Sequence, residues 1–272
     1  MNYKFEKELI SNTENVIEKI MEQKFVKPSY PKKFDVDDYV ILGLYDGIVS
    51  RFDSIIYLAE AEKFFGVESI ARGILEAHAF IIYIMERDTI NRAKAYYYSV
   101  KKKEIGLYKD LIREDEKGNK IRNYLNVSRN EIVDRFSMQS KELEEKSLKY
   151  VGKNKKNWYQ IEKKNNNFSE LCENLGLGEQ HYLLFKMFST EAHAKDAGKQ
   201  FEFDKSNDDI ELMYMTLKDI RHVIYYGALT VIEVTRLVYK YYGMDREKRI
   251  FNVNIGNKYK SINSRWSFEN LP

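Results

Sequence analysis

The sequence predicts an all-α protein, a multi-helix bundle with a long C-terminal helix and an irregular polar tail. Apolar residues recur at the 3.6-residue spacing of helices over most of the 272-residue chain. Only 3 Pro and 13 Gly interrupt these runs, which favours long helices. The chain lacks both the alternating pattern of sheets and an alternation of strands with helices.

Breakers divide the chain into three predicted parts. Pro28 and Pro31 separate an N-terminal helix and linker, residues 1–36, from the helical bundle of residues 37–243. The remaining residues, 244–272, form a polar and basic tail.

Periodicity and end signals predict eight helices. They cover residues 5–21, 37–66, 68–86, 88–112, 128–150, 168–176, 178–198 and 208–242. Ser128 and Glu131 fit a capping box at the start of the fifth helix. The other predicted segments are a polar turn at 115–120, an exposed loop at 152–167 with Trp158 and Tyr159 docked onto the body, a loop or short extended piece at 201–204, and a short strand at 251–255.

The composition excludes several classes of protein. Hydrophobic residues make up 43% and charged residues 32%, as in ordinary globular proteins, and a net charge of +3 does not demand a nucleic-acid partner. Cys172 is the single cysteine, which excludes a disulfide framework, and we interpret it as a packing residue. The N-terminus has no signal peptide and no apolar run is long enough for a membrane span, so we expect a cytoplasmic protein without a membrane partner.

Two polar pairs in otherwise apolar helical stretches locate a candidate site. Arg72 and Glu76 are four residues apart, as are Ser189 and His193. Residues i and i+4 share one face of a helix, and polar groups are rarely buried unless they are paired or used. We therefore predict that these four residues converge on one catalytic pocket.

Each pair has a functional and a structural interpretation. An Arg held in apolar surroundings can bind a phosphate or carboxylate, whereas an Arg–Glu pair can also only brace a helix. His193 is a candidate general base, and Ser189 a weaker candidate nucleophile of a small-molecule hydrolase. His78 lies about 240° around the helix from Arg72, so we interpret it as a structural histidine. We expect His181, near a helix start, to be exposed.

The sequence predicts neither a metal site nor a cofactor. The four histidines show no metal-ligand spacing, and no glycine loop for phosphates is present. A Lys-rich stretch at 141–164 contains Trp158 and Tyr159. This combination is typical of single-stranded nucleic-acid binding, but interspersed glutamates favour a solvated face.

Two segments resemble an uncharacterised helical family, domain-of-unknown-function family 5677. The first is the run from Ala71 to Ile84, and the second combines Trp158, residues 171–177 and the residues Tyr182, Phe185, Ser189 and His193. The resemblance covers about residues 39–242. It implies a helical fold and the same four candidate residues, without implying a reaction.

A more distant resemblance is to the higher eukaryote and prokaryote nucleotide-binding superfamily of toxin and phage-defence ribonucleases. Their active members carry an Arg and a His separated by four to six residues, often shared across a dimer. Five residues separate Arg72 from His78, but Gly73 stands where those proteins have a polar residue.

Two functional hypotheses follow. The first is a toxin-like or phage-defence protein that binds RNA or a nucleotide through Arg72, as a metal-independent ribonuclease if His193 or His78 supplies acid–base catalysis. The second is a non-enzymatic helical sensor or scaffold, a homodimer, in which the two pairs only brace the core.

Overall fold

The computed structural model describes residues 3–26, 33–153, 156–162, 165–192, 202–204, 209–211, 220–256 and 258. Its helices are α1 (Lys4–Thr13), α2 (Val16–Met21), α3 (Val36–Glu60), α4 (Val67–Glu86), α5 (Thr89–Ile112), α6 (Glu116–Leu125), α7 (Arg129–Tyr150), α8 (Phe168–Asn174), α9 (Gly178–Ala192), α10 (Arg221–Tyr241) and α11 (Asp245–Phe251). Single helical turns of other types lie at Glu22–Val26, Trp158–Ile161 and Asn252–Gly256. Two short strands, β1 (Glu202–Asp204) and β2 (Asp209–Glu211), pair antiparallel. The predicted all-α class is confirmed, with one small hairpin added.

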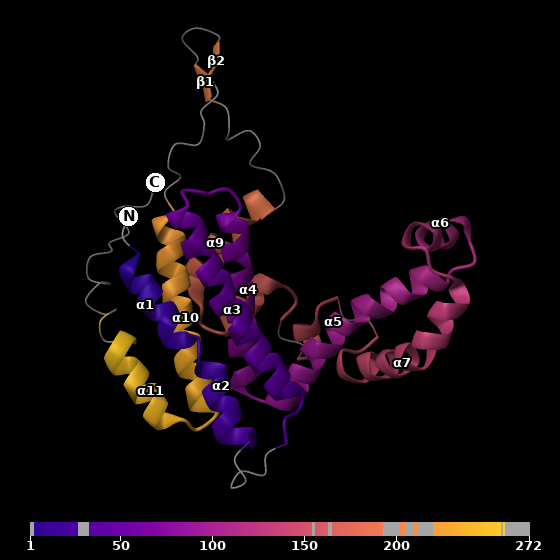
Figure 1. Cartoon of the computed structure of the whole chain (residues 1–272), viewed down its shortest axis with the longest axis horizontal. Helices are drawn as coiled ribbons and strands as arrows, with labels where there is room; N and C mark the ends of the chain where they lie inside the picture. Colours follow the sequence, from indigo (N-terminus) through magenta and orange to yellow (C-terminus); the bar gives the residue numbers. More distant parts are fainter. Residues whose placement is uncertain are drawn as a thin grey trace.

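The body of the molecule is built around α4 (Figure 1). This helix packs against α3, α5, α9 and α10, as its largely apolar sequence requires. α10 approaches α3 so closely that a Cβ at Gly227 would lie 2.5 Å from the ring of Phe52. Glycine is therefore needed at this contact. Leu9 of α1 and Phe251 of α11 join the same hydrophobic core, so both ends of the described chain pack onto the body.

A capping box starts α3 and connects it to the end of α10. The side chain of Asp35 accepts a hydrogen bond from the Val36 amide, and Asp38 closes the box. Asp38 is buried, and its Oδ1 accepts a hydrogen bond of 3.0 Å from the Tyr242 hydroxyl. A buried carboxylate with such partners avoids the cost of an unpaired charge.

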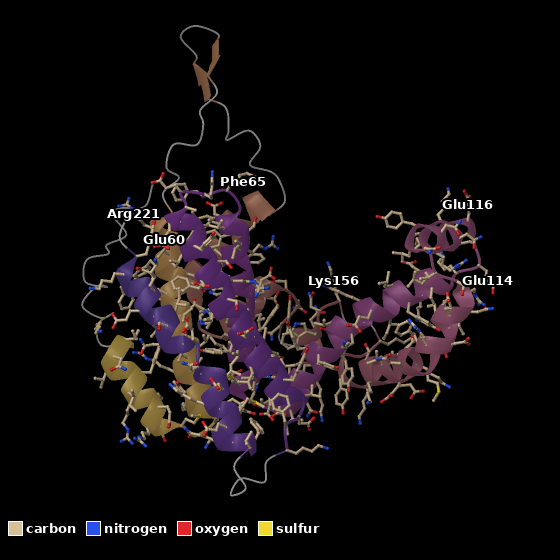
Figure 2. The ribbon with its side chains drawn as sticks, viewed as in Figure 1. Glu60, Phe65, Glu114, Glu116, Lys156 and Arg221 are labelled. Carbon is tan, nitrogen blue, oxygen red and sulfur yellow. The ribbon has the colours of Figure 1, made fainter. Side chains whose placement is uncertain are left out.

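The outer half of α5, residues 101–112, leaves the body together with α6 and α7; we call these three segments the arm. In Figure 1 the arm extends away from α3 and α4, and α7 packs along α5. The labelled Glu114 and Glu116 lie at its tip (Figure 2). Ser128 and Glu131 form the predicted capping box at the start of α7. The arm is thus a helical hairpin only one layer thick.

Three predicted elements were wrong. The polar turn expected at 115–120 is instead the start of α6, because the Asp115 side chain caps the amide of Gly118 at 3.0 Å. The strand expected at 251–255 is helical, continuing from α11. The last long helix does not begin at residue 208: Asp209–Glu211 forms β2, and α10 begins at Arg221.

The other elements follow the prediction with small differences. The first predicted helix is divided into α1 and α2, because the chain turns at Glu14 and Asn15. The extended piece expected at 201–204 is confirmed as β1. The aromatic residues of the C-terminal tail, Trp266 and Phe268, lie outside the described residues.

In the described part of the chain, no helix combines the length and the apolar character needed to cross a bilayer.

Candidate functional site

Arg72 and Glu76 form the ion pair that their spacing predicts, on the side of α4 that faces α9. Arg72 Nε donates to Glu76 Oε1 at 3.2 Å, and both side chains are partly exposed. The guanidinium carbon lies 4.6 Å from the centre of the Phe185 ring on α9, a cation–π distance. The pair therefore sits where α4 and α9 meet.

The structure describes only part of the second pair, Ser189 and His193. Ser189 lies on α9, four residues after Phe185, but its side chain is not among those described. His193 lies outside the described residues. The packing of α4 on α9 brings the backbone of Ser189 toward the helix that carries Arg72. Convergence of all four side chains stays a prediction.

A buried chain of hydrogen bonds joins two histidines through Tyr226. His78 Nδ1 lies 3.2 Å from the Tyr226 hydroxyl, which lies 2.7 Å from His181 Nδ1. His181 Nε2 lies 3.1 Å from the carbonyl oxygen of Leu75, and His78 Nε2 lies 3.0 Å from Glu233 Oε2. His78 is buried and hydrogen-bonded at both ring nitrogens, as its structural interpretation requires. The prediction that His181 is exposed was wrong, since its exposed fraction is 3%.

The direction of these hydrogen bonds can be assigned from their ends. The Leu75 carbonyl only accepts, so His181 Nε2 donates and its Nδ1 accepts from the Tyr226 hydroxyl. The Tyr226 oxygen then accepts from His78 Nδ1, and the carboxylate of Glu233 requires a second donor at His78 Nε2. This arrangement pairs His78 with Glu233 and directs the remaining hydrogen bonds toward the Leu75 carbonyl.

The surroundings shift the pKa values of His181, Glu233 and Tyr226 in directions that agree with these hydrogen bonds. Burial, followed by the charge of His78, lowers the pKa of His181 from 6.5 to about 4, which keeps it neutral. The hydrogen bond from His78 lowers the pKa of Glu233. Burial raises the pKa of the Tyr226 hydroxyl. The network is satisfied within itself and braces α4, α9 and α10.

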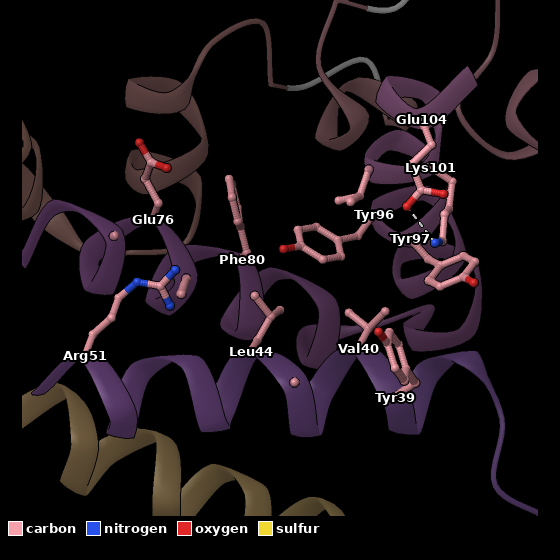
Figure 3. A pocket seen from close by; sticks show the side chains of 14 residues that line it. Tyr39, Val40, Leu44, Arg51, Glu76, Phe80, Tyr96, Tyr97, Lys101 and Glu104 are labelled. Atoms are coloured by element: carbon pink, nitrogen blue, oxygen red, sulfur yellow. Dashed lines mark hydrogen bonds and ion pairs between the residues drawn. The ribbon is translucent and has the colours of Figure 1, made fainter. Parts of the chain in front are cut away.

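A pocket of about 440 Å³ opens between α3, α4 and α5 on another side of α4 (Figure 3). Arg51 and Glu76 stand at one end, and the Lys101–Glu104 ion pair of 2.7 Å stands at the other. The side chains of Phe80 and Tyr96 lie between these ends. Glu76 thus contacts Arg72 on one side and lines the pocket on the other.

Arg51 is held in place by two glycines. Its Nη1 donates to the carbonyl oxygen of Gly47 at 2.8 Å. A Cβ at Gly47 would lie 2.7 Å from Nη1, and a Cβ at Gly73 would lie 2.8 Å from Nε. Glycine at position 73, the departure from the ribonuclease pattern, therefore makes room for the Arg51 side chain. Among the described residues, no carboxylate lies within ion-pairing distance of Arg51.

An aromatic cluster supports the wall of this pocket from behind. The rings of Phe80 and Tyr96 are 5.9 Å apart, and each is 5.2 Å from the ring of Trp158. Burial raises the pKa of Tyr96, while the charge of Arg51 opposes the shift. Trp158 and Tyr159 are buried, which confirms that they dock onto the body. They are therefore not available to stack on nucleic acid, and this part of the nucleic-acid interpretation was wrong.

The remaining reactive groups do not form a site of their own. Cys172 is buried and burial raises the pKa of its thiol to about 12, which agrees with the packing interpretation. Within the described ranges, His, Cys, Asp and Glu side chains do not gather in threes as metal ligands do.

Sequence reasoning missed Arg51, although the chain carries a signal for it. Gly43, Gly47 and Arg51 are spaced by four residues on one predicted helix, so they share a face. Two glycines on one face of a helix leave that face without side chains, and an Arg one turn further is positioned to use the space. Gly43 also lines the pocket.

Comparisons with known proteins place the chain in a family. No curated protein and no solved structure gives a significant match to the chain. The profile of a family of unknown function, DUF5677, matches residues 38–210, which include most of α3 and all of α4, α5 and the arm. The match covers more than half of the chain and names no wider superfamily. The chain therefore belongs to the family of unknown function DUF5677.

Proposed function

We propose that the pocket between α3, α4 and α5 binds a nucleotide, with Arg51 contacting its phosphate. The observation that carries this proposal is a guanidinium at the pocket wall for which the described residues supply no carboxylate. The planar fork of Arg matches two phosphate oxygens and forms charge-assisted hydrogen bonds. Arg51 takes over the role that the sequence assigned to Arg72, which is already paired with Glu76.

The rest of the lining suits the other parts of a nucleotide. The volume of about 440 Å³ falls within the usual range for small-molecule sites. Phe80 and Tyr96 offer ring surfaces on which a base can stack. Glu104, at the far end, can accept hydrogen bonds from ribose hydroxyls or base amines.

Calorimetric titration with AMP, adenosine and inorganic phosphate tests this proposal. We expect AMP to bind more tightly than adenosine. Arg51→Ala should weaken the affinity for AMP by about 10- to 100-fold, which is the usual contribution of a hydrogen bond to a charged group. Arg246→Ala, at an exposed arginine of α11, is the matched control and should bind AMP like the wild type. Equal affinity for AMP in wild type and Arg51→Ala would rule out the proposed phosphate contact.

A non-enzymatic sensor is the form of this function that the described lining favours. Cleavage of RNA without a metal needs a base for the ribose hydroxyl, and no histidine lines the described pocket. Binding without turnover, in the cytoplasm, is therefore our proposal. Incubating the protein with radiolabelled AMP distinguishes a sensor from an enzyme. A sensor should leave all of the AMP intact, whereas an enzyme would convert it to a product.

Metal-independent RNA cleavage by a toxin-like or defence protein is the second candidate. It is favoured by the contact of Arg72 with Phe185, one turn before Ser189 on α9. We expect the wild type to cleave total RNA in the presence of EDTA, and both Arg72→Ala and His193→Ala to lose this activity while remaining folded. Intact RNA after incubation with the wild type would remove this candidate and leave the binding proposal in place.

A further inference from the structure

The arm carries an apolar groove along the seam between α5 and α7. The groove has a volume of about 240 Å³ and a mainly apolar lining. Leu107 on α5 and Phe136 on α7 are 58% and 45% exposed. The apolar lining residues are Ile105, Leu107, Leu111, Ile132, Phe136 and Leu143. Exposed apolar surface of this kind, rimmed by charges, is typical of a site that another helix covers.

The spacing of the groove residues is that of a helical bundle seam. Leu107 and Leu111 are four residues apart on α5, and Ile132, Phe136 and Leu143 are separated by four and seven residues on α7. Each set forms one stripe on its helix. Two antiparallel helices with stripes on the same side are half of a four-helix bundle. A second hairpin of the same kind would complete it.

The charges beside the two stripes complement those of a second copy. Lys103 and Asp110 on α5 are seven residues apart, as are Arg135 and Glu142 on α7. Residues seven apart share a helix face, so each pair places opposite charges along the same edge of the groove. An antiparallel copy would bring Lys103 opposite Asp110, and Arg135 opposite Glu142.

One two-fold axis would satisfy both sets of charges. The midpoint of the first pair falls between residues 106 and 107, and that of the second between residues 138 and 139. Leu107 and Gln139 both line the groove, so the two midpoints lie at nearby levels of the hairpin. Arg129 Nε donates to the Ile112 carbonyl oxygen at 3.0 Å near one end of the hairpin, and the rings of Tyr98 and Tyr150 stack 5.3 Å apart near the other, so residues 107 and 139 lie at similar levels. Self-complementarity about a single two-fold axis is what a symmetric dimer requires.

We propose that the groove of the arm docks the arm of a second copy of this chain, closing a four-helix bundle across a two-fold axis. The groove adjoins the Arg51 pocket and shares Glu104 with its lining. The proposed dimer rests on the groove alone and does not depend on nucleotide binding. A helix from a different protein in the groove would leave the chain monomeric when purified.

Sedimentation velocity over a wide range of protein concentration tests this proposal. We expect the wild type to be dimeric and Phe136→Glu to be monomeric, because a carboxylate would be buried in the apolar seam. Met138→Glu is the matched control: this residue is 87% exposed, lies two positions further on α7, points away from the groove and should leave the dimer intact. A monomeric wild type, or a dimer that survives Phe136→Glu, would overturn the proposal.

A charge swap tests the two-fold axis itself. Arg135→Glu would place two acidic side chains opposite each other at both ends of the α7 contact. We therefore expect the dissociation constant of the dimer to rise about tenfold. Adding Glu142→Arg to the same chain should restore the wild-type dissociation constant within about threefold. Restoration by the double variant identifies the antiparallel pairing, since a merely structural effect of Arg135 would not be reversed. A double variant as weak as the single one would overturn the proposal.

Discussion

The body and the arm differ in the extent of their buried cores. In the body, buried polar side chains such as Arg92, His78 and His181 have hydrogen-bond partners from neighbouring segments. In the arm, large apolar side chains such as Leu107, Phe136 and Met138 remain exposed. The body therefore has its own complete core, while the arm is stabilised by one helix–helix seam. Internal substitutions should affect the body far more than the arm.

The largest expected effect concerns Arg92, which is fully buried. Its Nε and Nη2 donate to Glu162 at 2.9 and 2.6 Å, and its guanidinium carbon lies 3.8 Å from the centre of the Tyr83 ring. Because Arg92→Met leaves carboxylates without their buried partner, we expect it to lower the free energy of unfolding by about 3 to 5 kcal/mol. Arg87 contacts the same Glu162 but is half exposed, so Arg87→Met should cost at most about 1 kcal/mol. Urea denaturation measures both, and equal losses would contradict the contrast.

The pH dependence of stability should report the buried histidine of the body. His181 has a folded-state pKa of about 4, below its ordinary value of 6.5. Its unfolded form therefore takes up a proton first as the pH falls, and stability that is complete above pH 6.5 declines toward pH 4. We expect a loss of about 2 to 3 kcal/mol across this window.

The variant His181→Asn isolates this contribution. Its unfolding free energy should fall less steeply between pH 6.5 and pH 4.5, although it starts lower. Glu233, whose pKa is lowered, adds its own loss only at more acidic pH. If the free energy of unfolding falls equally steeply with pH in the variant and the wild type, His181 does not titrate as its burial implies.

The same substitution at two tyrosines compares the body with the arm directly. Tyr226→Phe removes the hydroxyl that joins His78 to His181, and we expect the free energy of unfolding to fall by about 1 to 3 kcal/mol because a buried donor and a buried acceptor lose their partner. Tyr124 lies on α6 and is 88% exposed. Tyr124→Phe should change stability by less than about 0.5 kcal/mol, as exposed sites do. Similar melting curves for the two variants would contradict the difference between the regions.

The smallest expected effects come from a matched pair of glycines. Gly73→Ala places a Cβ against the Arg51 side chain, so we expect AMP binding to weaken by about three- to tenfold, as when a charged hydrogen bond is partly lost. Gly106 on the arm has open space around it, and Gly106→Ala should leave AMP binding unchanged while stabilising α5 by about 0.5 to 1 kcal/mol. If Gly73→Ala binds AMP with the affinity of the wild type, Arg51 does not contribute to the AMP site.

Much of the fold was predictable because helical periodicity and capping residues are local signals. The boundaries of α4 and α5, and the Ser128–Glu131 box of α7, follow the sequence closely. The errors arose where local signals compete. Lys117, Gly118 and Asn119 are typical of a turn, yet the cap from Asp115 holds them in α6. The pairing of Asp209–Glu211 with β1 depends on a distant strand, which no helix signal at residue 208 reveals.

The candidate site was predictable only in part. The Arg72–Glu76 contact follows from i,i+4 spacing alone. The partners of His78 and His181 lie on α10, about 150 and 45 residues away, so sequence spacing could not identify them. The role of Arg51 depends on Gly73 from a second helix, which is a tertiary contact.

A crystal structure of the protein with AMP would test the central claim most directly. We predict a phosphate oxygen about 2.7 to 2.9 Å from the Arg51 guanidinium, with the base beside Phe80 and Tyr96. Phosphate bound elsewhere, for example at Arg72 between α4 and α9, would contradict the assignment of the pocket.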